Sequence, residues 1–86
     1  MEYNKEKVDE MVLALLYLTR FRDKYGTRAW KSIDWDAMDR LYEKGHIGNP
    51  KGKAKSVVLT EEGENLSKEL FIRHFGISET DPNLRT

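Results

Sequence analysis

The sequence contains no cysteine, which excludes disulfide bonds, thiolate nucleophiles and zinc sites built on cysteine. It also lacks an excess of charge of either sign, because 15 basic residues balance 15 acidic ones. No overall field therefore attracts the chain to nucleic acid or to an anionic membrane. Any such binding has to come from a local cluster of charges.

Long hydrophobic runs are absent as well. The longest, Met11 to Leu18, is far shorter than the roughly 20 residues that span a membrane. Acidic residues precede it where a secretory signal carries basic ones. We therefore expect a cytoplasmic protein with no membrane partner. At 86 residues, we expect one domain with a small core over residues 1–76 and a flexible tail over 77–86.

The sequence has little of what catalysis requires. His46 and His74 have no cysteine partner and no carboxylate at the spacing of a metal-binding helix, and there is no glycine-rich phosphate loop. Asp34, Asp36 and Asp39 lack the glycine and the glutamate of a calcium loop, so their position favours stabilisation of a helix N-terminus. We therefore expect no enzyme, no cofactor and no metal site.

The first predicted helix covers about residues 5–22, with Asn4 as a typical N-cap. One apolar stripe follows helical spacing and contains Val8, Met11, Val12, Leu15, Leu16 and Thr19. Other apolar residues lie off that stripe, so the helix needs cover on two sides. Either the rest of the chain wraps around it, or a second copy packs against it. The candidate interface residues are Leu13, Tyr17 and Leu18.

Residues 20–31 carry five basic side chains against one acidic side chain, interleaved with aromatic residues. Cations that alternate with rings are typical of a nucleic-acid surface, since cations meet phosphates and rings stack on bases. The alternative is that the charges complement the end of a helix and that Trp30 is a core residue. A short third strand is also predicted near residues 27–31.

The second predicted helix covers about residues 35–44, capped by Ser32 or Asp34 and ended by Gly45. Its expected buried face contains Trp35, Met38, Leu41 and Tyr42.

A β-hairpin with a basic turn is predicted over about residues 46–59. It contains the most concentrated charge of the chain, which either is a solvated loop tip or contacts phosphate. The candidate nucleic-acid-binding residues are Lys51, Lys53, Lys55, Arg28 and Lys31.

The third predicted helix covers about residues 61–75 and begins after Thr60, whose side chain can cap it. Gly63 falls in its first turn, where glycine costs roughly 1 kcal/mol relative to alanine unless close packing requires it.

The stretch Asp39–Ile47, the basic turn and the Leu59-Thr60-x-x-Gly63 step together resemble the C-terminal part of a winged-helix domain, as in bacterial regulators of the MarR and PadR kinds. This resemblance covers residues 34–70. Residues 1–76 as a whole resemble a family of small bacterial proteins classed as a domain of unknown function, on the stretches 34–36 and 53–56. This second resemblance implies a fold and no activity.

The chain departs from the winged-helix pattern at two points. Only residues 22–33 stand where a helix-turn-helix has its first helix, and this length is enough for a turn or a strand. The helix over 35–44 is acidic at its N-terminal end, where readout of DNA bases uses Arg, Lys, Asn and Gln. Sequence-specific reading of DNA by this helix is therefore disfavoured.

Taken together, the sequence predicts a small α+β domain of winged-helix-like fold with three main helices. The expected function is that of a non-enzymatic interaction module that binds another protein, above all itself as a homodimer through the first helix. The alternative is a nucleic-acid-binding protein that contacts phosphates through the basic turn.

Overall fold

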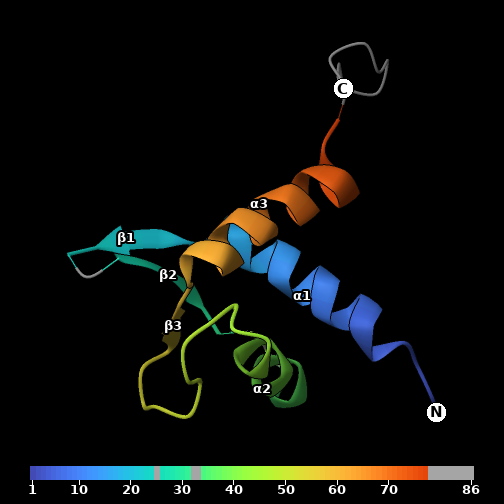
Figure 1. The fold of residues 1–86 in the computed structure, drawn as a ribbon, viewed down its shortest axis with the longest axis horizontal. Coiled ribbons are helices and arrows are strands. Elements are labelled where there is room, and N and C mark those ends of the chain that lie inside the picture. The colour runs from blue at the N-terminus through green and yellow to red at the C-terminus, as the bar shows by residue number, and fades with distance from the viewer. Residues whose placement is uncertain (25, 32–33, 78–86) are drawn as a thin grey trace.

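The computed structural model describes residues 1–24, 26–31 and 34–77. Its elements are α1 (Lys5–Thr19), β1 (Phe21–Asp23), β2 (Gly26–Trp30), α2 (Trp35–Glu43), β3 (Ser56–Val58) and α3 (Glu61–Phe75). Figure 1 shows α1 and α3 crossing the domain together, with α2 beside β3 and the β1–β2 hairpin extending away from the helices. The predicted α+β class and the three main helices are confirmed.

The sheet is antiparallel with the order β1-β2-β3, so β2 is its central strand. Phe21 pairs with Arg28 on one side of β2, and Val58 pairs with Arg28 on the other. Gly26 has a φ of 140°, which L side chains rarely adopt, so glycine suits the start of β2. The predicted strand near residues 27–31 is confirmed as β2.

The join between α2 and α3 is built from a few well-defined backbone contacts. Gly45 ends α2 with a φ of 80°, and the N–H groups of Gly45 and His46 bond to the carbonyls of Tyr42 and Leu41. This pattern is a Schellman motif. The Thr60 side chain accepts a bond from the Gly63 N–H at 2.9 Å and donates one to the Gly45 carbonyl at 2.7 Å. Thr60 therefore caps α3 and ties it to the end of α2.

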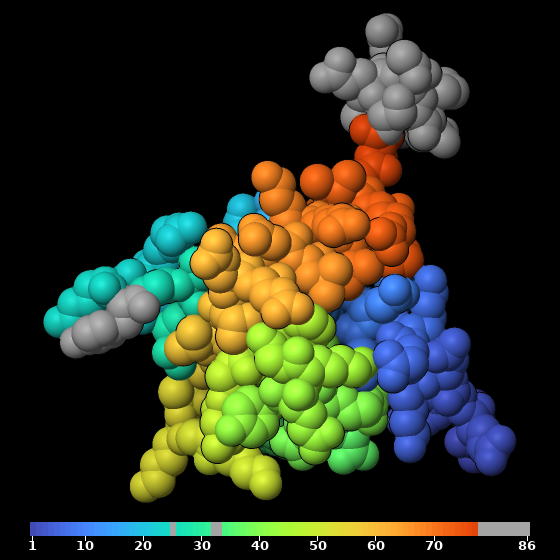
Figure 2. Space-filling view, in the orientation of Figure 1, coloured from blue at the N-terminus to red at the C-terminus, as the bar shows by residue number. Residues whose placement is uncertain are grey.

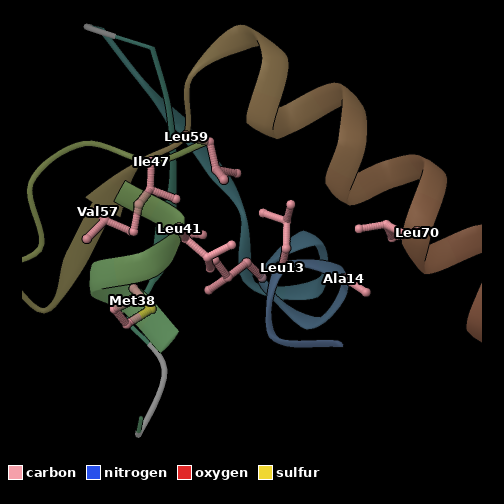
Figure 3. Close-up of a cluster of buried hydrophobic side chains, with 10 residues drawn as sticks. Leu13, Ala14, Met38, Leu41, Ile47, Val57, Leu59 and Leu70 are labelled. Atoms are coloured by element: carbon pink, nitrogen blue, oxygen red, sulfur yellow. The ribbon is translucent and has the colours of Figure 1, made fainter. Parts of the chain in front are cut away.

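The hydrophobic core lies where the three helices meet one face of the sheet. Figure 3 shows Leu13 of α1, Leu41 of α2 and Leu70 of α3 pointing toward one another, with Val57 and Leu59 beside them. The buried core residues are Leu13, Ala14, Leu16, Ala29, Met38, Leu41, Ile47, Val57, Leu59 and Leu70.

Two boundaries differ from the prediction. The first helix ends at Thr19 rather than near residue 22, because Arg20 is extended and Phe21 begins a strand that pairs with β2. The segment 46–59 is a loop closed by a single bridge between Ile47 and Leu59 rather than a full hairpin. Its strand, β3, instead pairs with β2. The hairpin that projects from the domain is therefore β1–β2.

Other expectations concern positions at the edge of the described residues. Ser32, one of the two proposed caps of α2, lies outside them, and Asp34 is the N-cap residue. Apart from Ile77, the predicted tail also lies outside them.

Within the described ranges, every helix is too short or too polar to cross a membrane. Between α1 and α2 the described chain contains a β-hairpin where a helix-turn-helix has a helix.

Candidate functional site

Helix α1 leaves an apolar row on the surface although three neighbouring elements cover its other sides. Its buried residues are Asp9, Leu13, Ala14 and Leu16, which face α2, α3 and β2. Leu15 and Leu18 are exposed by 47% and 64%, and Val8 and Met11 are half-buried. These four residues follow a spacing of three, four and three, which is the spacing of a coiled-coil contact row. We call Val8, Met11, Leu15 and Leu18 the α1 seam.

Aromatic residues of the hairpin extend this apolar surface. Trp30 is 51% exposed, and its ring lies 5.3 Å from that of Phe21. A shallow groove of about 160 Å³ runs between α1 and β2, and Val12, Leu15 and Trp30 are among the residues that line it. Trp30 is therefore a surface residue, and the expectation that it is a core residue is wrong.

The three candidate interface residues have different environments. Leu13 is 1% exposed and belongs to the core, so its side chain is not available to a partner and the expectation is corrected for this residue. Tyr17 is half-buried, with its ring 5.4 Å from that of Phe71. Leu18 lies on the surface as expected. Leu15, which belongs to the apolar stripe of the sequence pattern, is exposed as well.

A second surface forms where Lys31 meets the loop that precedes β3. The Lys31 N–H bonds to the Lys55 carbonyl at 2.9 Å, and its ammonium group donates to the Gly52 carbonyl at 2.8 Å. Pro50 is buried and anchors the loop, whose end Figure 2 shows in olive yellow projecting from the domain. The structure therefore brings Lys31 and the basic loop onto one face.

Between these segments and the start of α2 lies a cleft of about 460 Å³, which we call the Trp35 cleft. Its lining residues are Lys31, Trp35, Gly52, Lys53, Ala54 and Lys55. Trp35 is 58% exposed, although the sequence placed it on the buried face of α2, and Tyr42 is 46% exposed. The buried face of α2 is made by Ala37, Met38 and Leu41, so the expectation is wrong for both aromatic residues.

The other two candidate nucleic-acid-binding residues do not line the Trp35 cleft. The Arg28 guanidinium donates to the hydroxyl of Ser56 at 2.8 Å and to its carbonyl at 2.9 Å, so it is held against β3. Lys51 is exposed, and its N–H bonds to the side chain of Asn49. Lys31, Lys53 and Lys55 are therefore the three candidates that the fold gathers at one site.

A buried ion cluster fixes α2, and with it Trp35, against α1. The Asp9 carboxylate is 2% exposed and accepts bonds from Arg40 Nε at 2.9 Å and from Lys44 Nζ at 2.9 Å. Burial raises the pKa of Asp9, but the hydrogen bonds from Arg40 and Lys44 outweigh it, so the pKa lies below its usual range. The cluster therefore keeps its charges at neutral pH.

These features define a small α+β domain with an apolar helix seam and a basic aromatic cleft. The family model described as "Domain of unknown function (DUF6429)" matches residues 4–77, and the chain belongs to this family. The chain is also similar to "Uncharacterized protein y4hR" of Sinorhizobium fredii (strain NBRC 101917 / NGR234). The two are 49% identical over 75 residues, which cover 87% of this chain and 97% of that protein. No solved structure matches the chain.

Proposed function

We propose that this protein is a non-enzymatic interaction module that forms a homodimer through the α1 seam. The observation that carries the proposal is the exposure of Leu15 and Leu18 on a helix whose other sides are already covered. A row of apolar residues at coiled-coil spacing packs best against a second helix, because each side chain then inserts between side chains of the partner. Trp30 and Phe21 add aromatic area beside the seam.

A second copy of the chain fits this surface for two reasons. A two-fold interface uses the same patch on both subunits, and a helix that carries one uncharged row satisfies this requirement with itself. The formal net charge of zero removes the general repulsion between identical copies. The seam is short, so we expect a dimer that dissociates on dilution, at the small end of stable interfaces.

Charge introduced into the seam should separate the dimer. For Leu18→Glu, and separately for Leu15→Glu, we expect the dimer dissociation constant to rise at least about tenfold, because a carboxylate would be buried at the contact. The measurement is molar mass by light scattering over a dilution series, with circular dichroism as a check on folding.

Ile72→Glu is the matched control for the seam variants. Ile72 is 56% exposed and helical, but it lies two residues beyond the buried Leu70, on the opposite side of α3. We expect this variant to dimerise like the unchanged chain. Equal masses for the seam variants and the unchanged chain at every concentration would refute the proposed interface.

A second function, contact with nucleic-acid phosphates through the basic loop, is supported by one specific observation. Lys31, Lys53 and Lys55 line the same cleft, and none of the described residues that line it is acidic. The resemblance of residues 34–70 to a winged-helix domain, where a basic wing follows the helix, adds to this proposal. Binding would be weak and independent of sequence, since three lysines neutralise few phosphates.

Salt dependence measures this contact directly. For three phosphate contacts, the logarithm of the binding constant should fall against the logarithm of the salt concentration with a slope of about −2 for a single strand and about −3 for duplex DNA. The variant with Lys53→Glu and Lys55→Glu should lose most of the affinity for labelled DNA. Lys68→Glu alters an exposed lysine of α3 and should change it little. Equal affinities in the three proteins would exclude the basic loop as the contact.

A further inference from the structure

We infer that the Trp35 cleft binds a single strand of nucleic acid, with one base stacked on the Trp35 indole and the neighbouring phosphates against Lys53 and Lys55. The inference rests on the second proposed function and narrows it from phosphate contact in general to one class of ligand. Three lysines and one exposed tryptophan line the cleft, and these are the two kinds of group that a single strand requires.

Trp35 is placed as a stacking platform. It is the first residue of α2, so the helix fixes its backbone, and 58% of its surface remains exposed. The Lys31 ammonium lies 5.6 Å from the centroid of its ring and donates to the Gly52 carbonyl at 2.8 Å. Lys31 therefore holds the loop near the ring, and the cleft exists before a ligand arrives.

The loop carries its charges on a fixed backbone. The Lys55 carbonyl accepts from the Lys31 N–H, and the adjacent Ser56 begins β3, which pairs with Trp30. Lys53 and Lys55 are exposed on this framework. Because the sheet already orders the backbone at Lys55, the ordering cost when phosphates bind falls mainly on the lysine side chains.

The surroundings of the cleft favour one strand over two. In a duplex the bases are stacked inside and offer no free face to Trp35, whereas a single strand can present an unstacked base. A duplex would thus lose the stacking contact with Trp35.

The test compares three variants of the full chain by the anisotropy of a labelled oligothymidylate at low salt. Trp35→Ala should bind about tenfold more weakly than the unchanged chain, because stacking on an aromatic side chain contributes strongly per base. Trp35→Phe should retain most of the affinity. Tyr42→Ala removes an exposed aromatic residue of α2 outside both the cleft and the α1 seam and should bind normally.

Two further measurements separate this inference from the function on which it rests. Duplex DNA of the same length should bind more weakly than the single strand, and the fluorescence of Trp35 in a Trp30→Phe protein should be quenched by the strand. An oligouridylate run in parallel shows whether RNA or DNA binds more tightly. Tighter binding of either single strand than of duplex supports the inference.

Two results would overturn it. Equal, salt-dependent binding of single and double strands, with Trp35→Ala unaffected, would leave phosphate contact by the basic loop in place and remove the stacking site. Absence of binding to every one of these nucleic acids at low salt would remove both the stacking site and the second proposed function.

Discussion

Replacing Gly63 with alanine is expected to cost about 3 kcal/mol or more of the free energy of unfolding, because no space exists for one methyl group. A Cβ atom at this position would lie 1.8 Å from the carbonyl oxygen of His46 and 2.7 Å from its carbon. Both atoms belong to the backbone, so no side chain can rotate away. The clash would push α3 from the end of α2.

Urea unfolding measures this effect, and Gly52→Ala is its control. At Gly52 an added Cβ meets nothing within 4 Å. Gly63 lies inside a helix, where alanine is intrinsically better than glycine by roughly 1 kcal/mol. Without the contact with His46, Gly63→Ala would therefore increase the stability. A Gly63→Ala protein as stable as the original would therefore contradict the described packing of α3 on His46.

Asp9→Asn is expected to lower the free energy of unfolding by about 3 kcal/mol, since it removes the shared partner of two cations. The side chains of Arg40 and Lys44 are 21% and 33% exposed, so water compensates only part of the lost bonds. Glu69→Gln is the control, because Glu69 pairs with Arg73 on the surface. The control should cost less than about 0.5 kcal/mol.

The effect of Asp9→Asn should also depend on pH. The pKa of Asp9 is lower in the folded chain than the value of about 3.9 expected when unfolded. The stabilisation by this carboxylate is therefore complete above the unfolded pKa and is lost as the pH falls through the folded one. Urea titrations between neutral and acidic pH should show the two proteins converging. A gap that stays constant to the lowest pH would show that the charge of Asp9 does not matter.

The parts of the fold that local chemistry determines could be predicted from the sequence. Thr60 and the acidic residues after it define the start of α3, and Gly45 defines the end of α2 with a positive φ. Gly63 was expected to be costly unless a close contact required it, and the contact with His46 is that requirement. The capping signals at Thr60 and Gly45 act within one turn of a helix, so they need no knowledge of the tertiary structure, whereas the contact of Gly63 with His46 is visible only in the folded chain.

The buried face of α1 could not be predicted, because apolar residues occur around most of its circumference. Leu13 and Leu15 are equally apolar, and only the positions of α2, α3 and β2 decide that the first is buried and the second exposed. The candidate site could not be predicted for the same reason, because tertiary packing brings its residues together. Lys31 reaches the basic loop only through the pairing of β2 with β3, which are distant in the sequence.

The exposure of Trp35 was also beyond the sequence pattern. Helical spacing places it near Met38, but Trp35 is 58% exposed and lines a cleft together with the loop before β3. The position of an aromatic residue beside lysines that are distant in the sequence is visible only in the folded chain. The sequence did contain a signal, since basic and aromatic residues alternate before α2.

Sedimentation equilibrium of the unchanged chain tests the proposed self-association most directly. We expect the average mass of the unchanged chain to rise with concentration from the 10.1 kDa of one chain toward twice that value. For Leu18→Glu, the same rise should require concentrations at least about tenfold higher. A single-chain mass for the unchanged protein up to about 1 mM would mean that association is weaker than roughly 4 kcal/mol. That result would contradict a dimer formed through the α1 seam.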